Sequence, residues 1–178
     1  MAQTYSPVPE LNLLKAFQDR VGFEDYAEGF GLIDYADTAG LAAAWSKDPE
    51  FLARLVPFAQ ANGTGSEYAL WRVDDRDDLA TLPVVVFGDE GGLHVVARDV
   101  RELFQLLGHD REISVDWDSA YFYLPGGDGH RPGHRDYLGW LAEHFDLAPV
   151  ADPDTITAGA RAELGDRFAA WARPFLPG

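Results

Sequence analysis

The chain contains no cysteine among its 178 residues. It can therefore form no disulfide framework, no thiol nucleophile and no thiolate metal site. A reducing cytoplasm is compatible with this composition.

Segments that direct proteins to membranes or out of the cell are also missing from the sequence. Residues 1–7 have neither a basic start nor an apolar core, and no later run reaches the length that a membrane helix needs. We therefore expect a soluble protein in the cytoplasm.

Positive charge is scarce. The chain has 30 acidic and 14 basic side chains, which gives a formal net charge of −16. Such a chain repels nucleic-acid backbones and anionic membranes and favours a basic partner. We therefore expect no nucleic acid and no membrane among its partners, although acidity also serves solubility and does not by itself identify a partner.

Apolar residues, in contrast, are plentiful. Hydrophobic residues make up 47% of the chain and aromatic residues 13%, which indicates a globular fold rather than disorder. This length is enough for one domain and short for two. We predict a single domain over residues 1–178 with residues 1–10 frayed; the sequence leaves the oligomeric state open.

Residues 62–107 hold the clearest succession of predicted elements. The asparagine and glycines of residues 62–65 tolerate positive φ, so we expect a helix to end there and the chain to reverse. Runs of β-branched and aromatic residues then predict three strands, over residues 66–73, 82–87 and 93–97. The glycine-rich residues 88–92 join the last two strands as a hairpin.

Asp99 begins the next predicted helix. Its carboxylate can accept a hydrogen bond from a first-turn N–H, and Glu102 completes a capping box. The buried face of this helix comprises Val100, Leu103, Phe104 and Leu107.

Apolar residues at helical spacing predict further helices on both sides of this region. They cover residues 11–21, 41–45, 49–58 and 135–145, with a last helix capped by Asp154. Asp48 caps the helix over 49–58, which runs into the stop at residue 62. The stripe from Ile156 to Trp171 should dock on the preceding helix or on the sheet.

The segment between residues 113 and 133 is predicted to be a strand followed by a loop. Apolar and polar residues alternate over 113–118, and residues 121–124 extend that strand or form the next one. Two prolines and four glycines make residues 125–133 a loop. Helices around several strands predict an α+β fold.

Three short segments resemble the SUKH superfamily, which includes bacterial toxin-immunity proteins and yeast cell-wall assembly regulators. They are GSEYALW at residues 65–71, PVVVFGDEGG at residues 83–92 and ARDVREL at residues 97–103. The resemblance implies a single α+β domain with a twisted, mostly antiparallel sheet backed by helices. It also implies a non-enzymatic immunity protein that binds and neutralises a cognate toxin, typically a nuclease or another enzyme that targets nucleic acid. The alternative that it leaves open is an intracellular scaffold or regulatory protein-binding module.

Two pairs of residues could carry chemistry, and for each we favour a structural interpretation. Asp116 and Asp118 would project from one face of a strand, as paired catalytic carboxylates do, but burial of Trp117 on the other face explains the same alternation. His130 and His134 have a spacing typical of metal ligands, yet Pro132 and Gly133 lie between them and no third ligand is evident nearby, so we interpret both as loop histidines.

No set of nucleophile, base and oxyanion-stabilising group can be recognised in the sequence. We therefore predict that the protein is not an enzyme and has no catalytic residues, no metal and no cofactor.

Charge suggests where a basic partner would bind. Residues 67–118 hold 13 acidic and five basic side chains, so half of the net charge arises there. Such a surface steers a basic toxin to its binding site and raises the association rate. The predicted partner-binding residues are Asp74, Asp75, Asp77, Asp78, Asp89, Glu90, Asp116 and Asp118. Tyr121 and Tyr123 are candidate anchors, one of which we expect in the core.

Overall fold

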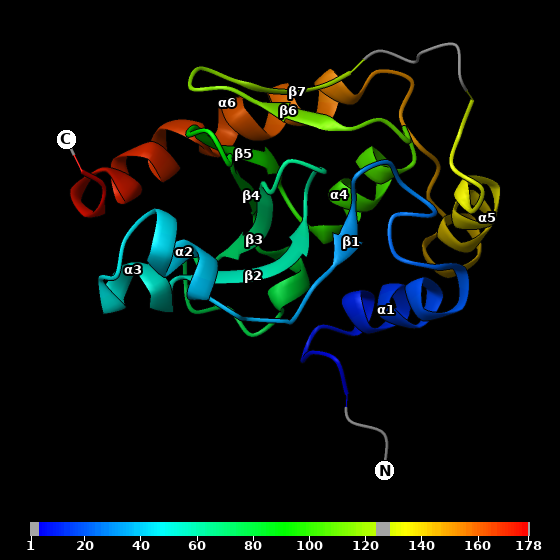
Figure 1. Cartoon of the computed structure of the whole chain (residues 1–178), viewed down its shortest axis with the longest axis horizontal. Helices are drawn as coiled ribbons and strands as arrows, with labels where there is room; N and C mark the ends of the chain where they lie inside the picture. The colour runs from blue at the N-terminus through cyan, green and yellow to red at the C-terminus, as the bar shows by residue number, and fades with distance from the viewer. Residues whose placement is uncertain (1–3, 124–128, 178) are drawn as a thin grey trace.

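A five-stranded antiparallel sheet lies at the centre of the protein in a computed structural model, which describes residues 4–123 and 129–177 (Figure 1). Neighbours in the sheet follow chain order. The strands are β1 (Gly31–Leu32), β2 (Leu55–Gln60), β3 (Glu67–Trp71), β4 (Val84–Phe87) and β5 (Leu93–Ala97). This arrangement confirms the α+β prediction and the three strands expected within residues 62–107.

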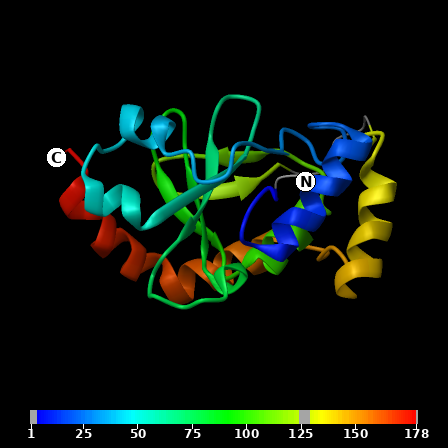
Figure 2. The ribbon, with the colours of Figure 1, turned by 90° about the horizontal axis from the view of Figure 1, so that it is seen from below.

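Helices cover both faces of this sheet (Figure 2). On one face, buried side chains of the sheet pack with those of α1 (Pro9–Val21), α4 (Val100–Leu107) and α5 (His134–Phe145). On the other face they pack with α2 (Ala39–Ala44), α3 (Pro49–Ala53) and α6 (Pro153–Ala172). The short helix η1 (Leu79–Thr81) precedes β4, and η2 (Arg173–Phe175) follows α6.

The prediction of a helix over residues 49–58 is wrong beyond Ala53. Asp48 does cap α3, its side chain accepting a hydrogen bond from the N–H of Glu50, but residues 55–60 form β2 between β1 and β3. Pro57 explains the difference, because proline breaks a helix interior but is tolerated at a β-bulge. The register of β2 against β3 shifts at Pro57. Residues 61–66 consequently connect two strands and do not end a helix.

A second, two-stranded sheet comprises β6 (Ile113–Val115) and β7 (Ala120–Phe122). The predicted strand over 113–118 therefore ends three residues early, and residues 116–119 form the turn of a hairpin. Trp117 lies in this turn with 77% of its surface exposed, so the expectation that it is buried opposite two strand aspartates is wrong. Of the residues expected to follow, 124–128 lie outside the described part of the chain.

The last helix begins two residues earlier than predicted. The N-cap of α6 is Asp152, whose side chain accepts a hydrogen bond from the N–H of Asp154 at 3.0 Å, with Pro153 in the first helical position. The expected stripe is confirmed, since Ile156, Ala160 and Phe168 are buried and the helix packs along β5.

The N-terminal segment, predicted to be frayed, contacts the core from residue 5 onwards, while residues 1–3 lie outside the described part. The hydroxyl of Tyr5 donates to the carbonyl oxygens of Ile33 and Phe58, and Val8 is buried. None of the described helices has the length and apolar character that crossing a bilayer requires.

Candidate functional site

The eight predicted partner-binding carboxylates are all exposed, but they fall into two groups at opposite ends of the central sheet. The first group, Asp74, Asp75, Asp77 and Asp78, lies in the loop between β3 and β4. The second group, Asp89, Glu90, Asp116 and Asp118, lies in the β4–β5 turn and the β6–β7 turn. The pairing of Glu67 with Phe87, and of Phe87 with Leu93, places the β4–β5 turn at the sheet end opposite to that loop. We call these the loop carboxylates and the tip carboxylates.

Nearby arginines partly neutralise the loop carboxylates. Arg76 donates to both carboxylate oxygens of Asp74 at 2.7 Å, and Arg54 lies 3.0 Å from Asp75. The hydrogen bonds from Arg76 lower the pKa of Asp74 to about 2. Asp78 caps η1 through the N–H of Ala80. Three of these four carboxylates thus have structural partners, two within the loop and one at the end of α3.

Asp89 anchors the tip carboxylates to the neighbouring β2–β3 turn. One of its carboxylate oxygens accepts hydrogen bonds from the hydroxyls of Thr64 at 3.0 Å and Ser66 at 2.9 Å. The backbone N–H of Asp89 donates to the same Ser66 oxygen at 3.1 Å. The two turns therefore form one connected surface at this end of the sheet.

Backbone hydrogen bonds hold the β6–β7 turn against the rest of the domain. The N–H of Asp116 donates to the carbonyl oxygen of Ser119 at 2.8 Å and closes the turn. His94 on β5 donates to the carbonyl oxygen of Asp116, and Arg161 on α6 donates to that of Asp118 at 3.0 Å. Gly92, at φ 82°, allows the close approach, because a Cβ there would collide with the Asp116 carbonyl. The turn is thus fixed from two elements.

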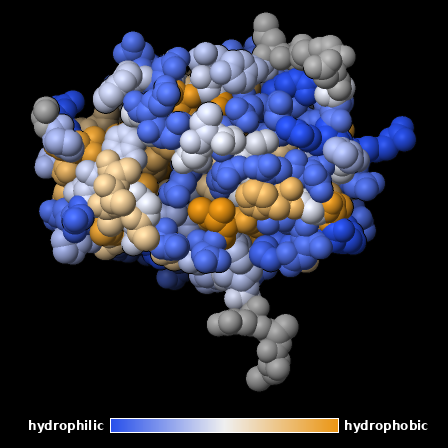
Figure 3. Space-filling view, in the orientation of Figure 1, coloured by the Kyte–Doolittle hydropathy of each residue, from blue (hydrophilic) through white to orange (hydrophobic). Residues whose placement is uncertain are grey.

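Trp117 is the most exposed of the large apolar side chains in the described structure, and two hollows adjoin it. Their volumes are about 280 and 370 Å³, and both are lined by Trp45, Trp117, Leu176 and Pro177. Asp89 and Glu90 also line the smaller hollow. Pale orange atoms gather over α2 beside the C-terminal end of α6, and further orange atoms lie among blue ones near the centre of this face (Figure 3). We call Trp117, its hollows and the tip carboxylates the Trp117 surface.

The two tyrosines of β7 and its flank are both exposed, contrary to the expectation that one is buried. Tyr121 is 38% exposed and Tyr123 49%, and their rings meet edge to face with centroids 5.9 Å apart. Phe122 between them faces the core instead. Both tyrosines remain candidate anchors; Tyr121 lies in the middle of β7, and Tyr123 directly follows the strand.

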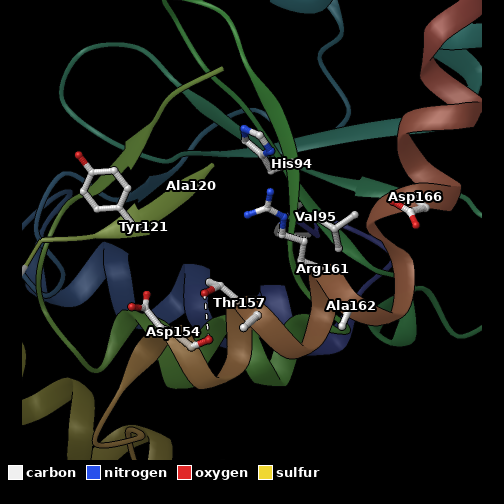
Figure 4. Close-up of a pocket in the computed structure, with 10 residues that line it drawn as sticks. His94, Val95, Ala120, Tyr121, Asp154, Thr157, Arg161, Ala162 and Asp166 are labelled. Carbon is white, nitrogen blue, oxygen red and sulfur yellow. Dashed lines mark hydrogen bonds between the residues drawn. The ribbon is translucent and has the colours of Figure 1, made fainter. Parts of the chain in front are cut away.

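A larger hollow of about 620 Å³ lies between β5, β7 and α6 (Figure 4). His94 and Arg161 extend into it from facing elements, while Tyr121 stands apart from both. The Thr157 hydroxyl lies within hydrogen-bonding distance of the carbonyl oxygens of Pro153 and Asp154 in its own helix. His94 and Arg161 are bound to turn carbonyls, so among the described lining residues no nucleophile is paired with a base. Of the polar groups here, His94 and Arg161 hold the hairpin in place.

The largest pKa shifts belong to core tyrosines. Burial raises the pKa of Tyr26, Tyr68 and Tyr137 well above the ordinary value of a phenol. These rings form the aromatic centre of the core, with Tyr26 and Tyr137 only 5.6 Å apart between centroids. Their shifts reflect packing, because desolvation is the largest cause of each.

The interpretation of His130 as a loop histidine is confirmed, because it precedes α5. The loop assignment of His134 and the absence of a third ligand are wrong. His134 is the first residue of α5 and is buried. Asp110, distant in sequence, joins them, and one ligand atom from each of the three residues lies within 4.8 Å of the others. No sequence motif spans that separation.

Comparison of the chain with protein families, with curated proteins and with solved structures found no match.

Proposed function

We propose that this chain is a non-enzymatic immunity protein, which binds and neutralises a cognate basic toxin in the cytoplasm through the Trp117 surface. The observation that carries the proposal is the exposed indole of Trp117 in an anchored turn between two carboxylates. The SUKH resemblance of residues 65–71, 83–92 and 97–103 supports the immunity role, since it implies proteins of this kind.

The Trp117 surface has the composition of a binding hot spot. Tryptophan is among the residues that contribute most to protein interfaces when the partner excludes water from them. The hollows beside Trp117 can accept apolar side chains of a partner. Hydrogen bonds from two elements hold the turn before binding, which lowers the entropy lost on association.

The tip carboxylates favour a basic partner. Asp89, Glu90, Asp116 and Asp118 are exposed around the indole. An enzyme that acts on nucleic acid binds phosphates with lysine and arginine side chains, and carboxylates can pair with the same cations. Binding at those side chains would compete directly with the toxin's substrate. This mode of neutralisation requires no catalysis by the immunity protein.

The experiment is a capture with the tagged full chain from lysate of the source cells, followed by a salt gradient and identification of the eluted proteins. The Trp117→Ala variant is run beside the wild type. We expect one basic protein that the wild type retains to high salt and the variant loses. Expressed alone it should stop growth, and co-expression of the wild-type chain should restore growth.

Other outcomes separate the alternatives. Several unrelated proteins bound by both forms would favour the scaffold or regulatory module. A captured toxin that is neutralised equally well by the Trp117→Ala variant would retain the immunity role but reject the Trp117 surface. Absence of any captured protein that arrests growth would overturn the immunity role.

A further inference from the structure

Three potential metal ligands meet on the side of the domain away from the Trp117 surface. Asp110 follows the C-terminal end of α4, His130 precedes α5, and His134 is its first residue. A carboxylate oxygen of Asp110 and one ring nitrogen of each histidine lie within 4.8 Å of one another. The fold thus brings together residues separated by up to 24 positions.

Asp110 supplies a carboxylate that is already fixed in place. Its side chain is fully buried. One oxygen accepts a hydrogen bond from the N–H of Glu28 at 2.9 Å, and the other accepts from the N–H of Arg131 at 2.8 Å and from Nδ1 of His130 at 3.0 Å. These bonds orient the carboxylate toward the histidines.

His134 supplies an imidazole whose free nitrogen can be assigned. Its Nε2 lies 2.9 Å from the carbonyl oxygen of Gly108. A carbonyl only accepts hydrogen bonds, so Nε2 carries the proton and Nδ1 keeps its lone pair. Metal-binding histidines usually donate their other N–H to a carbonyl or carboxylate in this way. The hydrogen bond from His134 to Gly108 is thus the kind of contact that orients a metal-binding histidine.

His130 supplies the adjustable ligand. Its ring stacks on His134 with centroids 4.0 Å apart and an angle of 20° between the planes. Stacked rings direct their lone pairs side by side, so the His130 ring must turn for both to reach one ion. About half of its side chain is exposed, which allows this rotation without repacking the core.

We propose that Asp110, His130 and His134 form a binding site for a divalent transition metal such as Zn²⁺. Two imidazoles and one carboxylate are a ligand set that Zn²⁺ uses, at bond lengths of about 2.0–2.2 Å. Tetrahedral bonds of that length place ligand atoms about 3.3 Å apart, so atoms that now lie within 4.8 Å of one another must draw closer as the His130 ring turns. His130 then exchanges its hydrogen bond to Asp110 for a bond from a deprotonated ring nitrogen to the ion. Mg²⁺ prefers oxygen ligands and should not bind here.

The neighbouring hollow provides room for a fourth ligand. It has a volume of about 260 Å³ and is lined by Glu28, Asp110, Arg111, Gly129, His130 and Arg131. The Arg131 guanidinium lies 3.9 Å from the Glu28 carboxylate, which offsets its positive charge. A water molecule or a small anion can complete the coordination. The bound ion would link the end of α4 to the start of α5.

The test titrates the chelator-treated full chain with Zn²⁺ and with Mg²⁺ by calorimetry, and records thermal unfolding with and without each ion. We expect one Zn²⁺ per chain, a higher melting temperature with Zn²⁺, and no effect of Mg²⁺. The His130→Ala variant should lose at least 10- to 100-fold in Zn²⁺ affinity, the range found even for residues that only orient ligands.

Variants of other positions make the result specific. His144→Ala removes an exposed histidine of α5 that lies outside the cluster. This variant should bind Zn²⁺ as the wild type does. Asp110→Asn keeps the size of the buried side chain and should also lose affinity; His130→Ala decides the question if Asp110→Asn fails to fold. The proposal is overturned by an absence of saturable Zn²⁺ binding, by unchanged affinity in His130→Ala, or by an equal loss in His144→Ala.

Discussion

His94 donates a hydrogen bond from its Nε2 to the backbone carbonyl oxygen of Asp116, 2.7 Å away. The donor is assigned because a carbonyl oxygen only accepts. This bond joins the edge strand β5 to the turn that presents Trp117, and Arg161 secures the other side of the same turn. Preorganisation of this kind reduces the entropy that binding costs.

Replacing His94 by alanine tests whether the fixed turn contributes to binding. His94→Ala should lower the free energy of unfolding by about 1 kcal/mol, the usual net value of one hydrogen bond. It should also speed hydrogen exchange of residues 116–119 and raise the dissociation rate of the captured partner. His94→Gln keeps a donor at this position and should restore part of both effects. Faster dissociation without faster exchange in the turn would contradict this explanation.

Removing the indole of Trp117 should separate binding from stability. Because 77% of its surface is exposed, Trp117→Ala should change the free energy of unfolding by no more than about 0.5 kcal/mol. Loss of a hot-spot residue should cost about 2 kcal/mol or more in binding, roughly a 30-fold rise in Kd. Urea unfolding and surface plasmon resonance measure the two quantities. Leu13→Ala, an exposed apolar residue on α1, is the matched control and should leave the Kd unchanged.

Neutralising each group of carboxylates separately tests which end of the sheet binds the partner. A variant with the four tip carboxylates changed to asparagine or glutamine should associate more slowly at low salt, and its rate should depend less on ionic strength. The same change in the loop carboxylates should have a smaller effect, because Arg76 and Arg54 already offset two of them. Equal effects of both variants would indicate a partner that spans both ends, or long-range steering by net charge.

Local patterns predicted the part of the fold that depends on neighbouring residues. The bounds of β5 and the cap of α4 by Asp99 agree with the sequence prediction, because turn glycines and a capping aspartate act within a few positions. The α3–β2 boundary is hidden in the sequence because Phe51, Leu52, Leu55 and Phe58 fit a helical period, and only Pro57 opposes a continuous helix. Residues 55–60 form a strand because they pair with β1 on one side and with β3 on the other.

The candidate sites depend on contacts that no local pattern contains. Alternation over residues 113–118 is equally compatible with a long strand and with a hairpin turn. His94 and Arg161, from β5 and α6, hold that turn and leave Trp117 exposed. Asp110 reaches His130 only because the segment before α5 folds back onto the end of α4. The exposure of Trp117 and the proximity of Asp110 to His130 both follow from packing. The sequence alone therefore names these residues as candidates but does not show which of them lie together.

Asp74 should titrate well below an ordinary aspartate. Its pKa of about 2 results from hydrogen bonds donated by Arg76. A folded-state pKa below the unfolded value stabilises the protein above the unfolded pKa of about 3.9, and this contribution is lost as the pH falls through about 2. Arg76→Gln should therefore raise the Asp74 pKa toward its ordinary range, measured by NMR titration of the carboxyl carbon. An unchanged pKa in the variant would assign the shift to another group.

Asn62 should be among the polar residues most important for stability, because it is buried and joins the β2–β3 turn to β6. Its side-chain oxygen accepts from the N–H of Ser66 at 3.0 Å, and its Nδ2 donates to the carbonyl oxygen of Ile113 at 3.0 Å. Asn62→Ala leaves the N–H of Ser66 and the carbonyl oxygen of Ile113 without the side chain that binds them. Each unsatisfied group costs about 1–3 kcal/mol. We expect a total loss of about 2–6 kcal/mol, seen as a lower urea midpoint with an unchanged slope.

Asn62→Asp is the matched comparison, since it keeps the acceptor for the turn N–H and removes the donor to Ile113. It should destabilise the protein at neutral pH by placing a carboxylate against the Ile113 carbonyl oxygen, and lowering the pH should recover stability as that carboxylate is protonated. The carboxyl group then regains a donor for the carbonyl. A variant that is equally unstable at low and neutral pH, relative to the wild type at each pH, would show that the contact between the β2–β3 turn and β6 does not depend on this hydrogen bond.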